Sequence, residues 1–155
     1  MIPAWGQGRV QPACRGVGRA LTYLGEATAA AHDLPEARRI FHDALRLAME
    51  LQATPLALDA LMGLAHVHAE AGGPEQAMEL SMRVLEHPAG TQDCKDRAGR
   101  LRARLETRLA AQQIQAALSR AQAKALDARA AEVLAAPGSP LGEDDSHPQS
   151  VRDSP

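Results

Sequence analysis

The stretch Asp33-Leu-Pro-Glu-Ala-Arg-Arg-Ile-Phe-His-Asp-Ala-Leu-Arg-Leu-Ala-Met-Glu-Leu51 predicts an amphipathic helix with a well-marked start. Asp33 can cap the helix through its side chain, Pro35 suits the first turn, and Glu36 completes a capping box. Apolar residues then recur at every third or fourth position, as in a helix that buries one face. These residues are Ala37, Ile40, Phe41, Ala44, Leu45, Ala48 and Leu51.

Proline and glycine divide the surrounding sequence into segments of helical length, because proline removes a backbone donor and glycine favours helix ends. A preceding helix is expected from Gly18 to His32, with Leu21, Leu24, Ala27 and Ala31 on its inward face. Further helices are expected after Thr54, Pro74 and Thr91, where Thr54 and Thr91 act as caps. The last two are expected over residues 110–125 and 127–135.

The composition favours an all-α protein with a single domain. The 155 residues include 32 alanines and 19 leucines, and the only aromatic residues are Trp5, Tyr23 and Phe41. We expect an irregular lead-in over residues 1–17, a folded region over 18–135, and a disordered acidic tail over 136–155. The tail is rich in proline, glycine and acidic residues, so it has little apolar surface to bury.

The charge balance and the cysteine content exclude several functional classes. A net charge of −2 and few aromatic residues argue against a dedicated nucleic-acid surface. The sequence contains no apolar run of transmembrane length and no signal-peptide pattern, which predicts a cytoplasmic protein without membrane contact. Cys14 and Cys94 are too few for a disulfide framework and are expected to be reduced thiols.

A pattern with an offset of 40 residues indicates a structural repeat. The predicted units cover residues 18–53 and 55–90, followed by a degenerate copy over 91–125 and a closing helix over 127–135. Small residues recur at Gly25 and Ala65 and at Ala37 and Ala77, where we expect paired helices to cross at close range. The matching positions are Leu21, Gly25, Ala37, Phe41 and Ala44 in the first copy, Leu61, Ala65, Ala77, Ser81 and Val84 in the second, and Leu101, Leu105, Ala117, Ala121 and Lys124 in the third.

At these residues the sequence resembles the tetratricopeptide repeat (TPR) family, whose unit is a pair of antiparallel helices. The sequence departs from the family pattern because Leu21 and Leu61 replace its tryptophan and because the period exceeds the usual 34 residues. The runs from Ala20 and from Ala44 are also similar to the MalT-like C-terminal helical-repeat region of bacterial transcriptional activators and signalling proteins. The resemblance implies a short right-handed solenoid of stacked helical hairpins.

The resemblance further implies a noncatalytic protein–protein interaction module of a bacterial regulatory or signal-transduction protein, either stand-alone or a truncated C-terminal segment. Its partner would be another protein or a missing neighbouring domain, and self-association is a further expectation. The family's register places a concave binding face on the first helix of each pair. The positions on this face would be Arg19, Thr22, Glu26, Asp59, Met62, His66, Arg102 and Glu106.

A basic stripe on the predicted fifth helix consists of Arg97, Arg100, Arg104 and Arg108. A solvated helix face is the ordinary interpretation of such a stripe. It could instead receive an acidic partner or the acidic tail of the chain. The alternative function is a nucleic-acid-associated transcriptional regulator fragment that uses these arginines.

No motif predicts an enzyme, a cofactor or a metal site. His66 and His68 are two residues apart on a predicted helix and therefore point in different directions, and no His-Glu-x-x-His sequence occurs. The glycine pairs before residue 19 lack the strand and the lysine of a phosphate loop. We therefore expect no catalytic residues, no bound cofactor and no metal.

Overall fold

The computed structural model describes residues 4–135, and the secondary structure in this range is entirely helical. The predicted all-α class is therefore confirmed. Within the described range, no helix is both long enough and apolar enough to span a membrane. The helices are α1 (Ala4–Ala30), α2 (Leu34–Glu50), α3 (Thr54–Glu70), α4 (Pro74–Glu86), α5 (Gln92–Glu106), α6 (Ala111–Ala123) and α7 (Leu126–Ala135).

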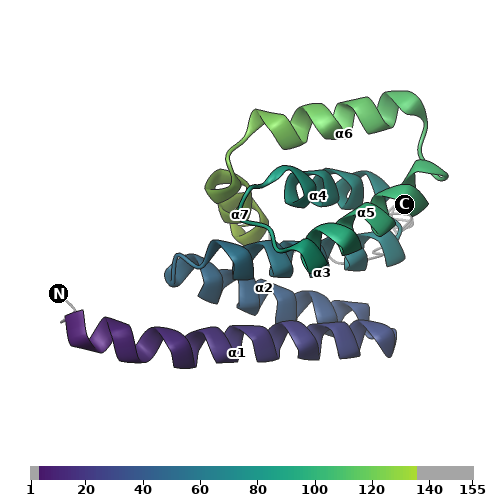
Figure 1. The fold of residues 1–155 in the computed structure, drawn as a ribbon. Helices are drawn as coiled ribbons and strands as arrows, with labels where there is room; N and C mark the ends of the chain where they lie inside the picture. The colour runs from purple at the N-terminus through teal and green to yellow at the C-terminus, as the bar shows by residue number, and fades with distance from the viewer. Residues whose placement is uncertain (1–3, 136–155) are drawn as a thin grey trace, which may run out of the picture.

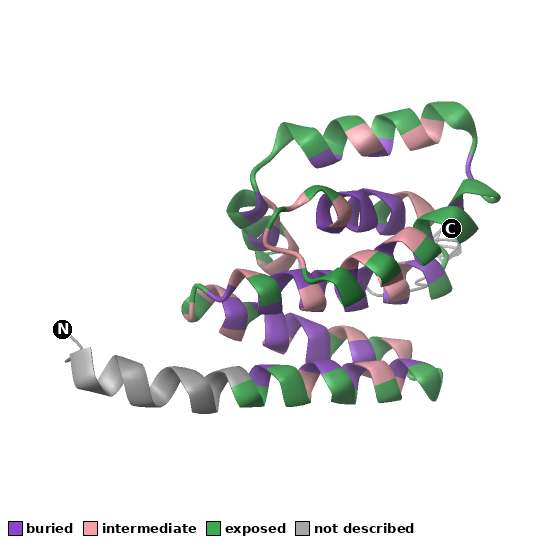
Figure 2. Cartoon of the chain, viewed as in Figure 1, coloured by how far each residue is buried: buried purple, intermediate pink, exposed green. Residues whose placement is uncertain are grey.

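The first five helices pack in chain order, each against the next. In addition, α1 contacts α3 and α3 contacts α5, so that these three alternate helices lie side by side. Helix α3 lies near the middle, whereas α1 and α6 lie at opposite ends of the molecule (Figure 1). The central helices are the most buried: α3 and α4 are mostly buried, whereas α6, at one end, is mostly exposed (Figure 2).

Most predicted helix starts are confirmed, but the expected capping box is wrong, because the Glu36 carboxylate pairs with Arg39 and the Asp33 backbone N–H donates to the Thr28 carbonyl. The Asp33 side chain accepts a hydrogen bond from the Glu36 backbone N–H at 3.3 Å, and the Thr91 hydroxyl accepts one from the Cys94 backbone N–H at 3.2 Å. The prediction that Thr54 caps α3 is wrong. The N-cap residue is Ala53, and Thr54 is the first residue of the helix.

Two expectations for the first helix are also wrong. Helix α1 begins at Ala4, so most of the expected irregular lead-in over residues 1–17 is helical. Of the expected inward residues, Leu21 is partly buried against the core, whereas Leu24, Ala27 and Ala31 are exposed. The inward face is instead formed mainly by Gly18, Thr22, Gly25 and Ala29. Leu24 is 53% exposed because the close approach of α2 selects the small residues of α1, not its largest ones.

The ring of Phe41 explains this close approach. A Cβ atom on Gly25 would lie 2.7 Å from Cε1 of Phe41, and one on Gly63 would lie 2.2 Å from the same atom. Phe41 therefore packs against the backbone of both α1 and α3, with 1% of its surface exposed. The prediction that a small residue at position 25 allows close helix packing is confirmed. The sequence pattern did not identify the contact between Gly63 and Phe41.

The third helix pair differs from the first two. Helix α6 packs against α4 and makes very little contact with α5. The residue of α5 that corresponds to Gly25 is Leu105, which is buried and too large to allow a close helix crossing. The last helix, α7, packs against α2. The predicted tail over 136–155 lies outside the described residues.

Candidate binding face

The three alternate helices α1, α3 and α5 form a face with two adjoining clefts. The first cleft has a volume of about 650 Å³ and an apolar floor that includes Phe41, Met62 and Leu101. Polar and charged side chains from all three helices line the rest of this cleft. They are Glu26, His66, Arg97, Arg100 and Arg104.

The second cleft has a volume of about 450 Å³ and a different electrostatic character. Asp59 and Asp93 supply two carboxylates to its wall, and Arg19 supplies a guanidinium group that donates a hydrogen bond to the Tyr23 hydroxyl at 3.4 Å. Leu56 contributes apolar surface. The face therefore has a cleft rich in cations next to one that contains two carboxylates.

Glu26 and Arg97 line both clefts and form an ion pair across them. The distance between the Arg97 Nη2 and Glu26 Oε1 atoms is 2.6 Å, and both side chains are partly buried. This pair connects α1 to α5 and separates the two clefts. Since Arg97 has this partner, it is not a free cation of the basic stripe.

The structure gathers six of the eight residues predicted for the concave face into these clefts. They are Arg19, Thr22, Glu26, Asp59, Met62 and His66. Thr22 is almost fully buried and its hydroxyl donates to the Gly18 carbonyl, so it shapes the wall rather than offering a free group. Arg102 and Glu106 lie outside both clefts and pair with each other on the exposed side of α5.

Two arginines of the basic stripe have partners within the chain, and the other two are exposed. Arg108 donates a hydrogen bond to the Ala69 carbonyl at 3.1 Å, and Arg97 pairs with Glu26. Arg100 and Arg104 are exposed, line the first cleft and form no ion pair with the described residues. These two guanidinium groups are consequently free cations of the first cleft.

The buried Cys94 thiol neighbours the carboxyl of Asp59, which lines the second cleft. Burial raises the pKa of the Asp59 carboxyl, although the Cys94 thiol and Arg97 oppose this shift. Burial and the neighbouring Asp59 carboxylate raise the pKa of the Cys94 thiol to about 12. The thiol therefore stays protonated at neutral pH and is a poor nucleophile.

The histidines take separate positions. His66 lines the first cleft, whereas His68 is largely buried, where desolvation together with Arg38, Arg129 and His42 lowers its pKa to about 4. Desolvation likewise lowers the pKa of His42. Across residues 4–135 there is no group of three or more His, Cys, Asp or Glu side chains arranged to hold a metal ion.

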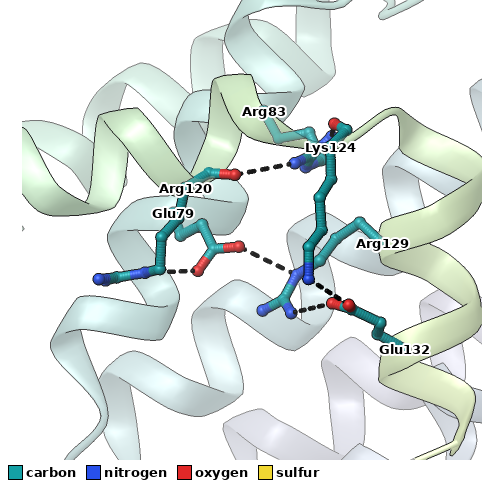
Figure 3. A network of polar contacts seen from close by, with 6 residues as sticks. All are labelled: Glu79, Arg83, Arg120, Lys124, Arg129 and Glu132. Atoms are coloured by element: carbon teal, nitrogen blue, oxygen red, sulfur yellow. Dashed lines mark hydrogen bonds and ion pairs between the residues drawn. The ribbon is translucent and has the colours of Figure 1, made fainter.

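The sequence analysis missed a charged network that fixes the C-terminal helices to α4 (Figure 3). The buried Glu79 carboxylate pairs with Arg120 of α6 at 3.2 Å and with Arg129 of α7 at 3.1 Å. Arg83 donates hydrogen bonds to the Lys124 and Arg120 carbonyls. The network comprises Glu79, Arg83, Arg120, Lys124, Arg129 and Glu132. The available signal was the pair Glu79 and Arg83, one helical turn apart among apolar positions of α4.

Comparison with models of known protein families, with curated proteins and with solved structures gave no significant match. The TPR-like interpretation therefore depends on the 40-residue repeat and on the order in which the helices pack.

Proposed function

We propose that this chain is a noncatalytic protein–protein interaction module that binds an extended polypeptide segment across α1, α3 and α5. The observation that carries the proposal is the pair of adjoining clefts on one face, lined by side chains from all three helices. Surface clefts with an apolar floor and a few polar groups are the usual form of binding sites. Burial of Cys94 and its pKa of about 12 argue against a nucleophilic role.

The charges of the two clefts suggest the chemistry of the bound segment. Arg100 and Arg104 stand beside an apolar floor, which suits an acidic residue next to an apolar side chain. Asp59 and Asp93 in the second cleft suit a basic residue farther along the same segment. The proposed ligand is therefore a peptide of mixed charge, with an acidic and apolar part followed or preceded by a basic part.

The repeat supports a TPR-like, right-handed stacking of helical hairpins as the architecture behind this face. Helices α1, α3 and α5 correspond to the first helices of successive pairs, and stacked helix pairs generally present such surfaces for binding. By the resemblance stated above, we infer a regulatory or signal-transduction setting in a bacterial cytoplasm. The partner would be another protein or a neighbouring domain.

The nucleic-acid alternative has weaker support. Arg97 and Arg108, half of the basic stripe, are engaged by Glu26 and by the Ala69 carbonyl. Of this stripe, only Arg100 and Arg104 remain to contact phosphates, and Asp59 and Asp93 lie on the same face. A surface on which these cations and Arg19 lie near two carboxylates is a poor match for a polyanion.

The test is a peptide array that varies the order of acidic, apolar and basic residues in ten-residue segments, followed by fluorescence anisotropy on the peptides that bind. We expect the double variant Arg100→Glu and Arg104→Glu to lower the affinity at least about tenfold and to reduce its salt dependence. Arg102→Glu is the matched control, because Arg102 is an arginine of the same helix that lies outside both clefts.

Three results would count against the proposal: no peptide binds, the double variant binds as well as the original chain, or Arg102→Glu causes the same loss. The same proteins are titrated with duplex DNA and single-stranded RNA at low salt. Binding to either nucleic acid that disappears in the double variant, without any peptide binding, would favour the alternative function.

A further inference from the structure

The outward side of α1 is an exposed apolar surface. The large apolar side chains that are exposed within the described residues all belong to this helix, with Val17 55%, Tyr23 60% and Leu24 53% exposed. Ala20, Ala27 and Ala31 are also exposed and lie on the same side at helical spacing. Between Gly16 and Ala31, this side carries no charged residue. We call this surface the outer face of α1.

Helix α3 of the same chain has an equivalent face that is covered by other helices. A shift of 40 residues relates the outer face of α1 to a set of apolar residues on α3, of which each is at most 1% exposed. These residues are Ala57, Ala60, Leu61, Leu64 and Val67. They are covered because α3 lies between α2 and α4. The outer face of α1 thus has the composition of a surface that packs against a helix.

The opposite end of the molecule has a different surface. Helix α6 exposes Gln112, Gln115, Ser119 and Gln122, which water can solvate. Helices α1 and α6 lie at opposite ends of the molecule (Figure 1). Helical arrays require polar outer surfaces at their ends to remain soluble, and α6 meets this condition whereas α1 does not. Among the residues whose burial the structure describes, the exposed apolar surface is therefore confined to one end.

We propose that the outer face of α1 binds the same face of a second copy of this chain, with the two helices antiparallel and the two Leu24 side chains at the twofold axis. Val17 and Ala31 are each seven residues from Leu24, so each large valine would meet a small alanine of the other copy. Pairing of large with small side chains allows close helix packing.

The absence of charge on this face also favours self-association. Two identical charged faces would repel each other, whereas the outer face of α1 brings no like charges together. A parallel arrangement would instead place Val17 against Val17 and Ala31 against Ala31, which leaves one end crowded and the other loose. The antiparallel arrangement is the one that the order of side-chain sizes favours.

This inference does not depend on the proposed peptide binding. Arg19 and Glu26, which line the clefts, lie on a different side of α1 from Leu24, and Tyr23 lies at the border between the outer face and the second cleft. A dimer centred on Leu24 therefore leaves the first cleft open. The face spans the sixteen residues from Gly16 to Ala31, or about 24 Å of helix. Such a short contact predicts a weak dimer that dissociates on dilution.

The first test is sedimentation velocity of the 155-residue chain between about 1 µM and 500 µM. We expect the mass to rise from 16.4 kDa to twice that value as the concentration increases. Leu24→Glu brings two carboxylates together at the axis and should raise the dissociation constant at least about tenfold. Ala116→Glu, on the exposed side of α6, is the control and should leave it unchanged.

A second test addresses the orientation, because residue 20 of one copy would face residue 28 of the other. Ala20→Glu alone and Thr28→Lys alone should both weaken the dimer, and an equimolar mixture of the two variants should restore it. Circular dichroism melting of every variant establishes that it is folded. A chain that stays monomeric throughout, or a dimer that Leu24→Glu does not weaken, would overturn the proposal. A mixture without restored association would overturn the antiparallel arrangement.

Discussion

The ring of Phe41 leaves no space for a side chain at position 63, since a Cβ atom there would lie 2.2 Å from Cε1 of Phe41. The same ring edge faces Gly25 of α1. One aromatic side chain of α2 thus determines how closely the helices on both sides of it approach. A buried ring held between two glycines cannot move away from one of them without colliding with the other.

Gly63→Ala should therefore destabilise the protein, by about 1–3 kcal/mol, although alanine is the better helix former. Urea denaturation followed by circular dichroism measures the change. Gly99→Ala is the matched control, because a Cβ on Gly99, in the middle of α5, meets nothing within 4 Å. That variant should be as stable as the original chain or more so.

A double variant tests whether collision with the Phe41 ring causes the loss of stability in Gly63→Ala. Phe41→Leu shortens the side chain at the point of collision, so Gly63→Ala should cost less in the Phe41→Leu background than alone. Strict additivity of the two free-energy changes would show that the ring does not cause the loss.

The sequence could predict most helices of this fold because their signals are local. Asp33, Thr91 and the prolines act on the backbone within one turn, and the apolar spacing of α2 and α5 matches their buried residues. The orientation of α1 was not predictable in this way. Leu24 and Gly25 are neighbours, and packing against Phe41 of α2, together with that of Gly18 against Leu56 of α3, places Gly25 inward.

Glu79 should be important for the attachment of α6 and α7. Glu79→Gln removes the charge that Arg120 and Arg129 share, and the loss of one partner of a buried ion pair should cost about 2–4 kcal/mol. Hydrogen exchange should show faster opening of α6 and α7 than of α1 to α3. Glu132→Gln is the control, because its carboxylate is exposed and the expected change is below about 1 kcal/mol. Uniformly faster exchange in all helices would contradict the local role.

Part of the binding face was predictable from the repeat in the sequence. A repeat of 40 residues places Arg19 and Asp59 at equivalent positions, and the structure brings both to one cleft. The register fails in the third copy, where Arg102 and Glu106 point away and Arg100 and Arg104 line the cleft instead. The replacement of a small residue by Leu105 accompanies this change, and its effect depends on packing that no local pattern reports.

Because of His68, the free energy of unfolding should decrease as the pH is lowered from about 6.5 to about 4. The folded state holds the pKa of His68 at about 4, below its ordinary value, so the unfolded chain binds the proton first as the pH falls. This contribution to stability is complete above about pH 6.5 and is lost towards pH 4, up to about 3 kcal/mol in total.

His68→Gln isolates this contribution from the carboxylates that titrate in the same range. The difference in unfolding free energy between the variant and the original chain should change with pH over this interval and be constant above it. His32→Gln is the control, since His32 is exposed in the turn after α1. A pH dependence that His68→Gln leaves intact would assign the acid sensitivity to other groups.

The Cys94 thiol should react with Ellman's reagent far more slowly in the folded chain than in the unfolded one. A Cys14→Ser variant leaves Cys94 as the single thiol of the sequence. With a pKa of about 12, its thiolate fraction at pH 8 is about a thousandfold below that of a free cysteine. Asp59→Asn removes the neighbouring negative charge and should raise the rate several-fold, whereas Asp96→Asn, on the exposed side of α5, should not. Fast labelling of the folded Cys14→Ser chain would contradict the burial of this thiol and would make a nucleophilic function worth testing.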